Sequence, residues 1–362
     1  MMVTIEALIN LMMANQVAIP LLDPILNILY GIPLLGYLLA FILWKPIFAG
    51  LVCPGFATLG VILMLFPWIE RKLVARMQWR VGPREILPQF GGIIQLLADS
   101  LRFLFQEVIV HRDAKQPYFV QFPVLSFIPA LLPLLFIPAG VIVAVKSAYG
   151  VQIILALVCL FPFFILGLGW ASNSRFAYIG TVREAFMYFA YEIPFIIAVL
   201  AMIVLYGTSD PVAIAGMSVP GIILNPLAAL TFFIAAAMAT SRLPFEIAEA
   251  DQELAAGPHV EYSGILFGLI YVMCYEKMYI LSGLMTILFL GGGSGPEIAI
   301  LGDLSGVVYF MVKTVIVMTL LAALRGVYPR YRLDQGLKIG WSSMLIMGTL
   351  ALVISLAEVL IL

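Results

Sequence analysis

Residues 242–264 read Arg-Leu-Pro-Phe-Glu-Ile-Ala-Glu-Ala-Asp-Gln-Glu-Leu-Ala-Ala-Gly-Pro-His-Val-Glu-Tyr-Ser-Gly and separate two strongly apolar segments. This stretch holds a single arginine and one of the two histidines of the chain. If it is helical, Glu246, Glu249 and Glu253 fall at i, i+3 and i+7 and share a face that either meets water or lines a cavity. Its acidic residues are Glu246, Glu249, Asp251, Glu253 and Glu261.

A solvated, charged connector is the alternative for this acidic loop, by which we mean residues 242–261. The glutamates, however, alternate with proline, phenylalanine, isoleucine and leucine, whereas a solvated segment has fewer apolar residues. His259 has no second histidine or cysteine at a metal-ligand spacing. We therefore predict a packed acidic loop without a metal site.

The composition predicts a membrane protein. Hydrophobic residues make up 63% of the chain and charged residues 11%, against about 25% charged in soluble proteins. A net charge of -1 gives no reason to expect nucleic acid as a partner. The three cysteines lack CxxC spacing, and no GxGxxG, Walker A or HExxH motif occurs. Any redox cofactor is therefore expected on another chain.

The fold expected is an all-α, polytopic bundle of membrane-spanning helices. A spanning helix needs about 20 mostly apolar residues. Eight core spans are predicted in the domain 47–362, and one more is possible in the N-terminal segment 1–46, where Pro33 interrupts the apolar run. The nine candidates are 25–44, 47–68, 120–145, 150–170, 185–206, 221–241, 262–290, 304–324 and 340–361.

Basic residues collect in every second loop. Of the 19 Lys and Arg, stretch 70–118 holds eight, 171–184 two, 242–261 one and 325–338 four. Because short cytoplasmic loops hold the excess of Lys and Arg, these four loops are predicted on the cytoplasmic side and the C-terminus on the other. The side of the N-terminus depends on whether 25–44 spans.

The long first loop is expected to contain an amphipathic helix. Within 91–105 apolar residues recur at helical spacing, while Gln95, Asp99 and Arg102 form one polar stripe. This pattern favours a helix lying at the membrane interface, with a re-entrant or ordinary surface helix as the alternative.

Four ionisable residues fall inside predicted spans: Glu192, Glu276, Lys277 and Lys313. Such residues are costly in a membrane and usually mark a pathway or a partner. One interpretation is a structural ion pair, for example between Lys313 and Glu276. The other is a polar file that runs from the acidic loop into the membrane and transmits a proton.

Ordered blocks of sequence over roughly 47–345 resemble the H subunit of respiratory complex I, the proton-pumping NADH:quinone oxidoreductases. They include Glu70-Arg71-Lys72, Arg80-Val81-Gly82-Pro83, Ala98-Asp99, Ser174-Arg175-Phe176-Ala177, Tyr191-Glu192, Arg242-Leu243-Pro244-Phe245-Glu246, Gln252-Glu253-Leu254, Glu261-Tyr262-Ser263-Gly264, Pro329-Arg330 and Gly340-Trp341.

The resemblance implies a protein of an energy-coupling membrane, most simply the prokaryotic cell membrane, that lines a quinone tunnel opening to lipid near the amphipathic helix. Quinone would be the substrate, with iron-sulfur clusters and any flavin on partner subunits. Those partners would be the peripheral-arm subunits that hold the terminal cluster and the quinone head, small membrane subunits and antiporter-like pump subunits. The tunnel residues implied are Arg71, Arg76, Arg80, Asp99, Arg175, Arg183, Arg242 and Phe245.

The same resemblance implies that carboxylates couple quinone reduction to proton pumping. The residues assigned to this coupling are Glu192, Glu246, Glu249, Asp251, Glu253, Glu261, Glu276 and Lys313.

Several positions depart from the family pattern. A glutamate of the family is replaced by Cys274, and Glu276 lies two residues later, about 200° around a helix. Its family role therefore does not transfer directly. Arg84, Leu87-Pro88 and the extra span at 25–44 also differ, which suggests a divergent, archaeal-type branch whose electron donor need not be NADH.

Two other functions remain open. The first is the anchor subunit of a membrane-bound, energy-converting hydrogenase, which the arginine-rich first loop disfavours. The second is a stand-alone secondary transporter, which the absence of an inverted repeat disfavours.

Overall fold

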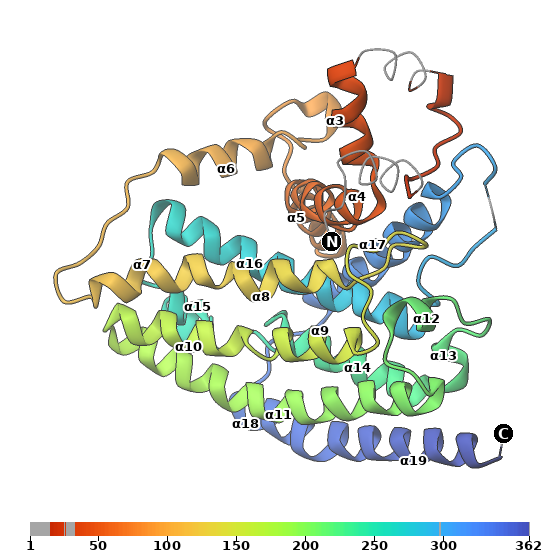
Figure 1. Ribbon diagram of the computed structural model, residues 1–362. Helices are drawn as coiled ribbons and strands as arrows, with labels where there is room; N and C mark the ends of the chain where they lie inside the picture. The colour runs from red at the N-terminus through yellow and green to blue at the C-terminus, as the bar shows by residue number, and fades with distance from the viewer. Residues whose placement is uncertain (1–14, 25, 27–32, 297, 362) are drawn as a thin grey trace.

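The computed structural model describes residues 15–24, 26, 33–296 and 298–361, and in these ranges the only regular elements are helices (Figure 1). The all-α prediction is thus confirmed. The elements are α3 Pro33–Leu43, α4 Lys45–Leu51, α5 Phe56–Met77, η1 Pro88–Phe90, α6 Gln95–Phe105, α7 Gln116–Leu125, α8 Phe127–Leu131, η2 Leu132–Leu135, α9 Gly150–Val158, α10 Phe161–Ser172, α11 Arg175–Tyr206, α12 Pro211–Ala215, α13 Gly221–Leu224, α14 Pro226–Ala239, α15 Asp251–Leu254, η3 Gly257–His259, α16 Gly264–Phe289, α17 Leu304–Val327, α18 Leu333–Lys338, η4 Ile339–Met344 and α19 Leu345–Ile361.

Seven helical segments in the described ranges are long and apolar enough to cross a membrane. Together with the shorter apolar helix α14 they account for the eight core spans predicted. Residues 25 and 27–32 of the possible ninth span lie outside the described residues, and its described helical part, α3, has 11 residues. The seven long segments are Lys45–Met77, Gln116–Leu135, Gly150–Ser172, Arg175–Tyr206, Gly264–Phe289, Leu304–Val327 and Leu333–Ile361.

The span expected at 221–241 is broken into α13 and α14. Pro226 disfavours a helical conformation at Asn225, which therefore ends α13 and caps α14. The Asn225 side chain accepts a hydrogen bond from the Ala228 amide at 2.9 Å and donates to the Ala351 carbonyl at 2.8 Å. This buried side chain thus ties α14 to α19 where the helix is interrupted.

Other helices end elsewhere than predicted. The span expected at 120–145 ends at Leu135, three residues before Pro138, which cannot continue a helix. Conversely, α5 continues to Met77 and α11 begins at Arg175, so Glu70, Arg71 and Arg183 lie on helices and not in loops.

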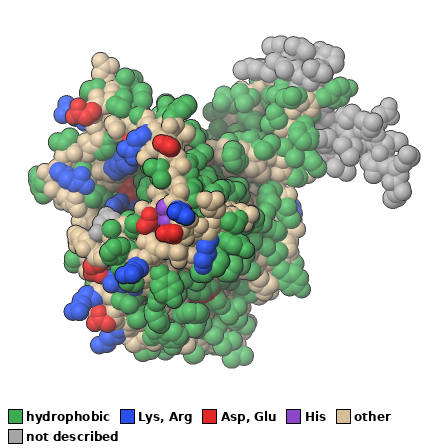
Figure 2. All heavy atoms as spheres, turned by 90° about the vertical axis from the view of Figure 1, so that its left-hand side faces the viewer, with side chains coloured by type: hydrophobic (Ala, Val, Ile, Leu, Met, Phe, Trp, Pro, Cys, Tyr) green, Lys and Arg blue, Asp and Glu red, His purple; other side chains and the backbone are tan. Residues whose placement is uncertain are grey.

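The predicted basic loops meet at one end of the bundle, toward the left in Figure 1. The Lys115 amide donates to the Ala171 carbonyl at 3.1 Å, and the Tyr331 amide to the Pro244 carbonyl at 2.9 Å. Figure 2 faces this end and shows charged side chains gathered on one part of it, with hydrophobic side chains over the neighbouring surface. We call it the charged end; its assignment to the cytoplasmic side stays a prediction.

Helix α16 lies at the centre of the bundle and is the most buried of the long segments. The amphipathic helix is confirmed as α6, which packs on α16 through Phe103 and Phe267, whose ring centroids lie 5.6 Å apart. Leu97, Leu101 and Leu104 on α6 remain exposed. An exposed apolar stripe of this kind fits a membrane interface.

Candidate functional site

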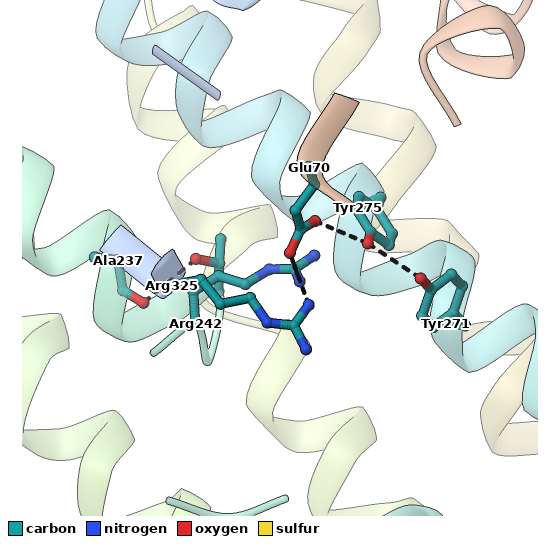
Figure 3. Close-up of polar contacts among 7 residues, drawn as sticks. Glu70, Ala237, Arg242, Tyr271, Tyr275 and Arg325 are labelled. Carbon is teal, nitrogen blue, oxygen red and sulfur yellow. Dashed lines mark hydrogen bonds and ion pairs between the residues drawn. The ribbon is translucent and has the colours of Figure 1, made fainter. Parts of the chain in front are cut away.

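A buried carboxylate, Glu70 near the end of α5, organises the centre of the charged end (Figure 3). Its Oε1 accepts hydrogen bonds from Arg242 and Arg325, both at 2.8 Å. Its Oε2 accepts a hydrogen bond from the Tyr275 hydroxyl at 2.9 Å, and the Tyr271 hydroxyl lies 3.1 Å from that of Tyr275. Burial of an ion pair is tolerated only where such additional hydrogen bonds satisfy its remaining atoms. One carboxylate thus joins α5, α16, α17 and the acidic loop.

Arg242 opens the acidic loop and is held between Glu70 and an aromatic ring. Its guanidinium carbon lies 4.6 Å from the centroid of the Tyr275 ring, a cation–π contact. Burial acts to lower the pKa of Arg242, but Tyr275 and Glu70 outweigh it and hold the pKa above its ordinary value. The guanidinium therefore stays charged.

A cavity of about 400 Å³ lies beside this cluster. Arg71, one of its lining residues, donates to Asp99 of α6 at 2.9 Å and so connects the cavity wall to the amphipathic helix. Arg80 donates to Gln78 at 2.8 Å. The lining residues are Glu70, Arg71, Val74, Gln78, Arg80, Leu243, Tyr271 and Arg325.

A second cavity of about 580 Å³ shares Arg80 with the first. Its walls include Trp68, Leu73 and Phe90 as well as Arg76. Ligand sites combine apolar walls with a few polar groups that fix the orientation of the ligand. The second cavity supplies mainly apolar walls, and the first supplies mainly polar and charged side chains. The structure thus brings Arg71, Arg76, Arg80, Asp99 and Arg242 into one region.

The acidic loop is not a continuous helix, so the condition under which Glu246, Glu249 and Glu253 would share a face is not met. Within the loop only the single turn α15 and the short η3 are helical, and positive φ at Ala255, Ala256 and Gly257 separates them. Phe245 is buried with its ring centroid 5.5 Å from that of Tyr331, away from both cavity walls.

The glutamates of the acidic loop have separate partners. Glu249 pairs with His259 at 3.1 Å. Burial acts to raise the pKa of Glu249, but His259, Arg242 and Lys277 together hold it below the ordinary value. Glu253 is more exposed and pairs with Arg183 and Arg330, and the Arg183 hydrogen bond lowers its pKa.

The remaining acidic residues of the loop are Glu246, Asp251 and Glu261. Glu246 interacts electrostatically with Arg325. Glu261 is partly buried, and Asp251 opens α15, its side chain being outside what the structure describes.

Three ionisable residues, Glu184, Glu192 and Lys277, lie deeper in the bundle than the acidic loop. Glu184 and Lys277 are buried, and Lys277 interacts electrostatically with Glu184, Glu192 and Glu249. Glu192 borders a cavity of about 10 Å³ together with Cys159, a volume at the lower limit for one water molecule. Four ionisable side chains from α11, α16 and the acidic loop therefore lie close together.

The ion pair considered between Lys313 and Glu276 does not form. Lys313 instead donates to the carbonyls of Leu290 at 2.8 Å, Gly292 at 3.0 Å and Ser294 at 2.9 Å, where α16 ends. Glu276 is buried, and in the described part of the chain no ion pair involves it and its Oε2 has no hydrogen-bond partner.

Arg175 lines a different cavity, between the ends of α7, α10 and α11, which shares no lining residue with the two above. Of the residues at the centre, Glu70, Glu184, Tyr275 and Arg325 were not among the predicted site residues. Glu70 and Arg325 stand at the junction of an apolar run and a basic loop. A charged residue at the end of an apolar run, before the loop begins, is the signal that could have identified them.

Comparisons with known proteins agree with this architecture. The NADH dehydrogenase family matches residues 50–356. The chain is 34% identical over 308 residues to the NADH-quinone oxidoreductase H subunit of Dehalococcoides mccartyi, covering 84% of each chain. It is 33% identical over 304 residues to the H subunit of Geobacillus kaustophilus, covering 83% of this chain and 89% of the relative. Against the H subunit of Orientia tsutsugamushi it is 36% identical over 279 residues, 75% of this chain and 78% of the relative.

Proposed function

The chain belongs to the H-subunit family of NADH-quinone oxidoreductase, a membrane component of complex I, and we propose that its two neighbouring cavities form part of the path by which quinone reaches the reaction site. The observation that carries this proposal is the pair of cavities that share Arg80 beside the buried Glu70 cluster.

The walls of this path suit a quinone. The second cavity, which we call the outer cavity, has Trp68, Ile69 and Phe90 for contacts with an isoprenoid tail. The cavity beside Glu70, which we call the inner cavity, has Arg71, Arg80 and Tyr271 for polar contacts with the quinone head. The polar groups of the inner cavity would fix the orientation of the head, while the apolar walls of the outer cavity would accommodate the tail. Asp99 would brace Arg71 from α6, and Arg183 would brace the acidic loop through Glu253.

The quinone is reduced by two electrons and takes up two protons, with the electrons supplied by iron-sulfur clusters that we place on partner subunits. Charge that develops in the inner cavity acts first on Glu70, Arg242 and Arg325, because they border or join it. Arg242 also acts on Glu249, which acts on Lys277. Glu184 and Glu192, which both interact electrostatically with Lys277, would come next, on the way to the antiporter-like pump subunits. We propose this file as the start of proton coupling.

Substitution of Arg80 tests the path. Arg80→Ala in the assembled complex should raise the KM for quinone about fivefold, the effect of losing about 1 kcal/mol of polar contact. The matched control is Arg332→Ala, an arginine at the same end that is 85% exposed and lines neither cavity. Quinone titrations of donor-driven turnover give both values. An Arg80→Ala KM equal to that of the control would contradict the proposed path.

A further inference from the structure

A third cavity at the charged end has the composition of an anion site and shares no lining residue with the two cavities proposed as the quinone path. It occupies about 510 Å³ where α7 begins, α10 ends and α11 begins. Lys115 precedes α7, Trp170 belongs to the last turn of α10, and Arg175 is the first residue of α11. The lining residues are Lys115, Gly169, Trp170, Asn173, Ser174, Arg175, Tyr178 and Ile179.

Neither cation of this cavity has an acidic partner in the described part of the chain. Lys115 and Arg175 form no ion pair with a carboxylate there, whereas Arg183 and Arg242 at the same end do. Lys115 Nζ instead lies 3.3 Å from the centroid of the Trp170 ring, a cation–π contact that holds the ammonium at the cavity wall. The first turn of α11, which also borders the cavity, has no side-chain cap, so its amide groups add partial positive charge.

A line of aromatic rings leads from the cavity into the membrane-spanning part of α7 and α10. The ring centroid of Tyr118 lies 5.4 Å from that of Trp170 and 6.3 Å from that of Phe122. Phe122 is in turn 6.4 Å from Phe163, which is more than half exposed on α10. Such a surface fits an acyl chain, and free phosphate would make no use of it.

We propose that this cavity binds the phosphate headgroup of an anionic phospholipid, with one acyl chain lying along Tyr118, Phe122 and Phe163. The exposed Trp170 and Tyr178 mark the depth of a membrane interface, where indole and phenol rings collect. A headgroup there meets Lys115 and Arg175 at the level where lipid phosphates lie. The lipid would fix the ends of α10 and α11 without entering the quinone path.

Photolabelling of the assembled complex tests this proposal. The probe is phosphatidylglycerol with a photoreactive acyl chain, titrated into phosphatidylcholine vesicles that contain the complex. Labelled peptides from 116–125 and 161–172 are then quantified by mass spectrometry. Because each interfacial cation contributes about fivefold to binding of an anionic lipid, Arg175→Gln should raise the half-labelling concentration about fivefold and Lys115→Gln with Arg175→Gln about thirtyfold.

Control variants separate this site from general attraction to the surface. The double variant Lys146→Gln with Lys338→Gln removes two exposed lysines outside the cavity and should label as the wild type does. Lys115→Arg retains the charge and should also label normally, and the single Arg175→Gln removes no contact that would unfold the chain. Equal labelling of all variants would overturn the proposal, as would loss of labelling with Lys115→Arg as severe as with Lys115→Gln. If inorganic phosphate abolished labelling, free phosphate would occupy the cavity in preference to the lipid headgroup, and the assignment to a lipid would be overturned.

Discussion

Glu70 and Arg242 form a buried ion pair, and removing either partner should destabilise the protein. Both side chains are largely withdrawn from solvent, with exposed fractions of 1% and 11%, and their atoms lie 2.8 Å apart. Removing one partner of a buried pair costs about 3–5 kcal/mol because the other charge is left uncompensated. Arg325 also contacts Glu70, but it is 40% exposed and compensates only in part. We therefore expect the lower end of this range, about 3 kcal/mol, for Arg242→Gln.

A double-mutant cycle measures the coupling directly. Glu70→Gln and Arg242→Gln should each speed heat inactivation of the purified complex, and the double variant should be more stable than the two single effects predict. A coupling of about 2 kcal/mol corresponds to about thirtyfold in the inactivation rate. The inactivation half-time is the appropriate measure because a large membrane complex unfolds irreversibly.

The control cycle uses Arg332 and Asp334, a pair 3.8 Å apart whose side chains are 85% and 76% exposed. Exposed pairs contribute about 0–1 kcal/mol, so this cycle should give almost no coupling. If Glu70→Gln and Arg242→Gln were additive in the same assay, the central role given to Glu70 would be refuted.

Two further expectations concern carboxylates of the proposed coupling file. Because the pKa of Glu249 is held below the ordinary 4.5, its ionised form contributes stability that is complete above about pH 5 and is lost as the pH falls through the lowered value. Heat inactivation of the wild type should therefore accelerate more below pH 4.5 than that of Glu249→Gln, and parallel acid profiles would contradict the Glu249–His259 pairing. Glu192→Gln should lower quinone-linked proton translocation about tenfold or more while the complex still assembles. Glu358→Gln, on α19 outside the file, serves as its control, and wild-type pumping by Glu192→Gln would remove Glu192 from the proposal.

Sequence alone located the spans well because a bilayer demands long apolar runs, and these runs are visible without any structure. It misplaced helix ends for two physical reasons. At Asn225 a proline and a capping side chain divide an apolar run that hydropathy treats as continuous. Helix α11 begins as early as Arg175 because this side chain faces a cavity. Helix α5 continues past Glu70 because partners on neighbouring elements form hydrogen bonds with its carboxylate.

The sequence indicated which residues gather in the candidate site, but it did not indicate which of them form ion pairs. Arg71, Arg80 and Arg242 were expected together; Arg71 and Arg80 line the cavity beside Glu70, and Arg242 contacts Glu70 itself. Glu70 was overlooked because its partners Arg242 and Arg325 are 172 and 255 residues away in the sequence. The helical face expected for the acidic loop failed because the periodicity argument assumes a helix, and backbone turns at Pro244 and Gly257 prevent one.

The acidic loop connects two charged groups that would otherwise be separate. Its first residue, Arg242, contacts Glu70 at the inner cavity, and Glu249 lies among the charges that act on Lys277 inside the bundle. Replacing a buried ionic group by apolar residues is often neutral or even stabilising, so stability alone gives little reason to bury this many charges in a chain with 11% charged residues. A change of charge in the cavity, on the other hand, would shift Arg242 and alter the field on Glu249 and Lys277 together. We therefore propose that coupling between cavity and membrane accounts for both groups and for the loop that joins them.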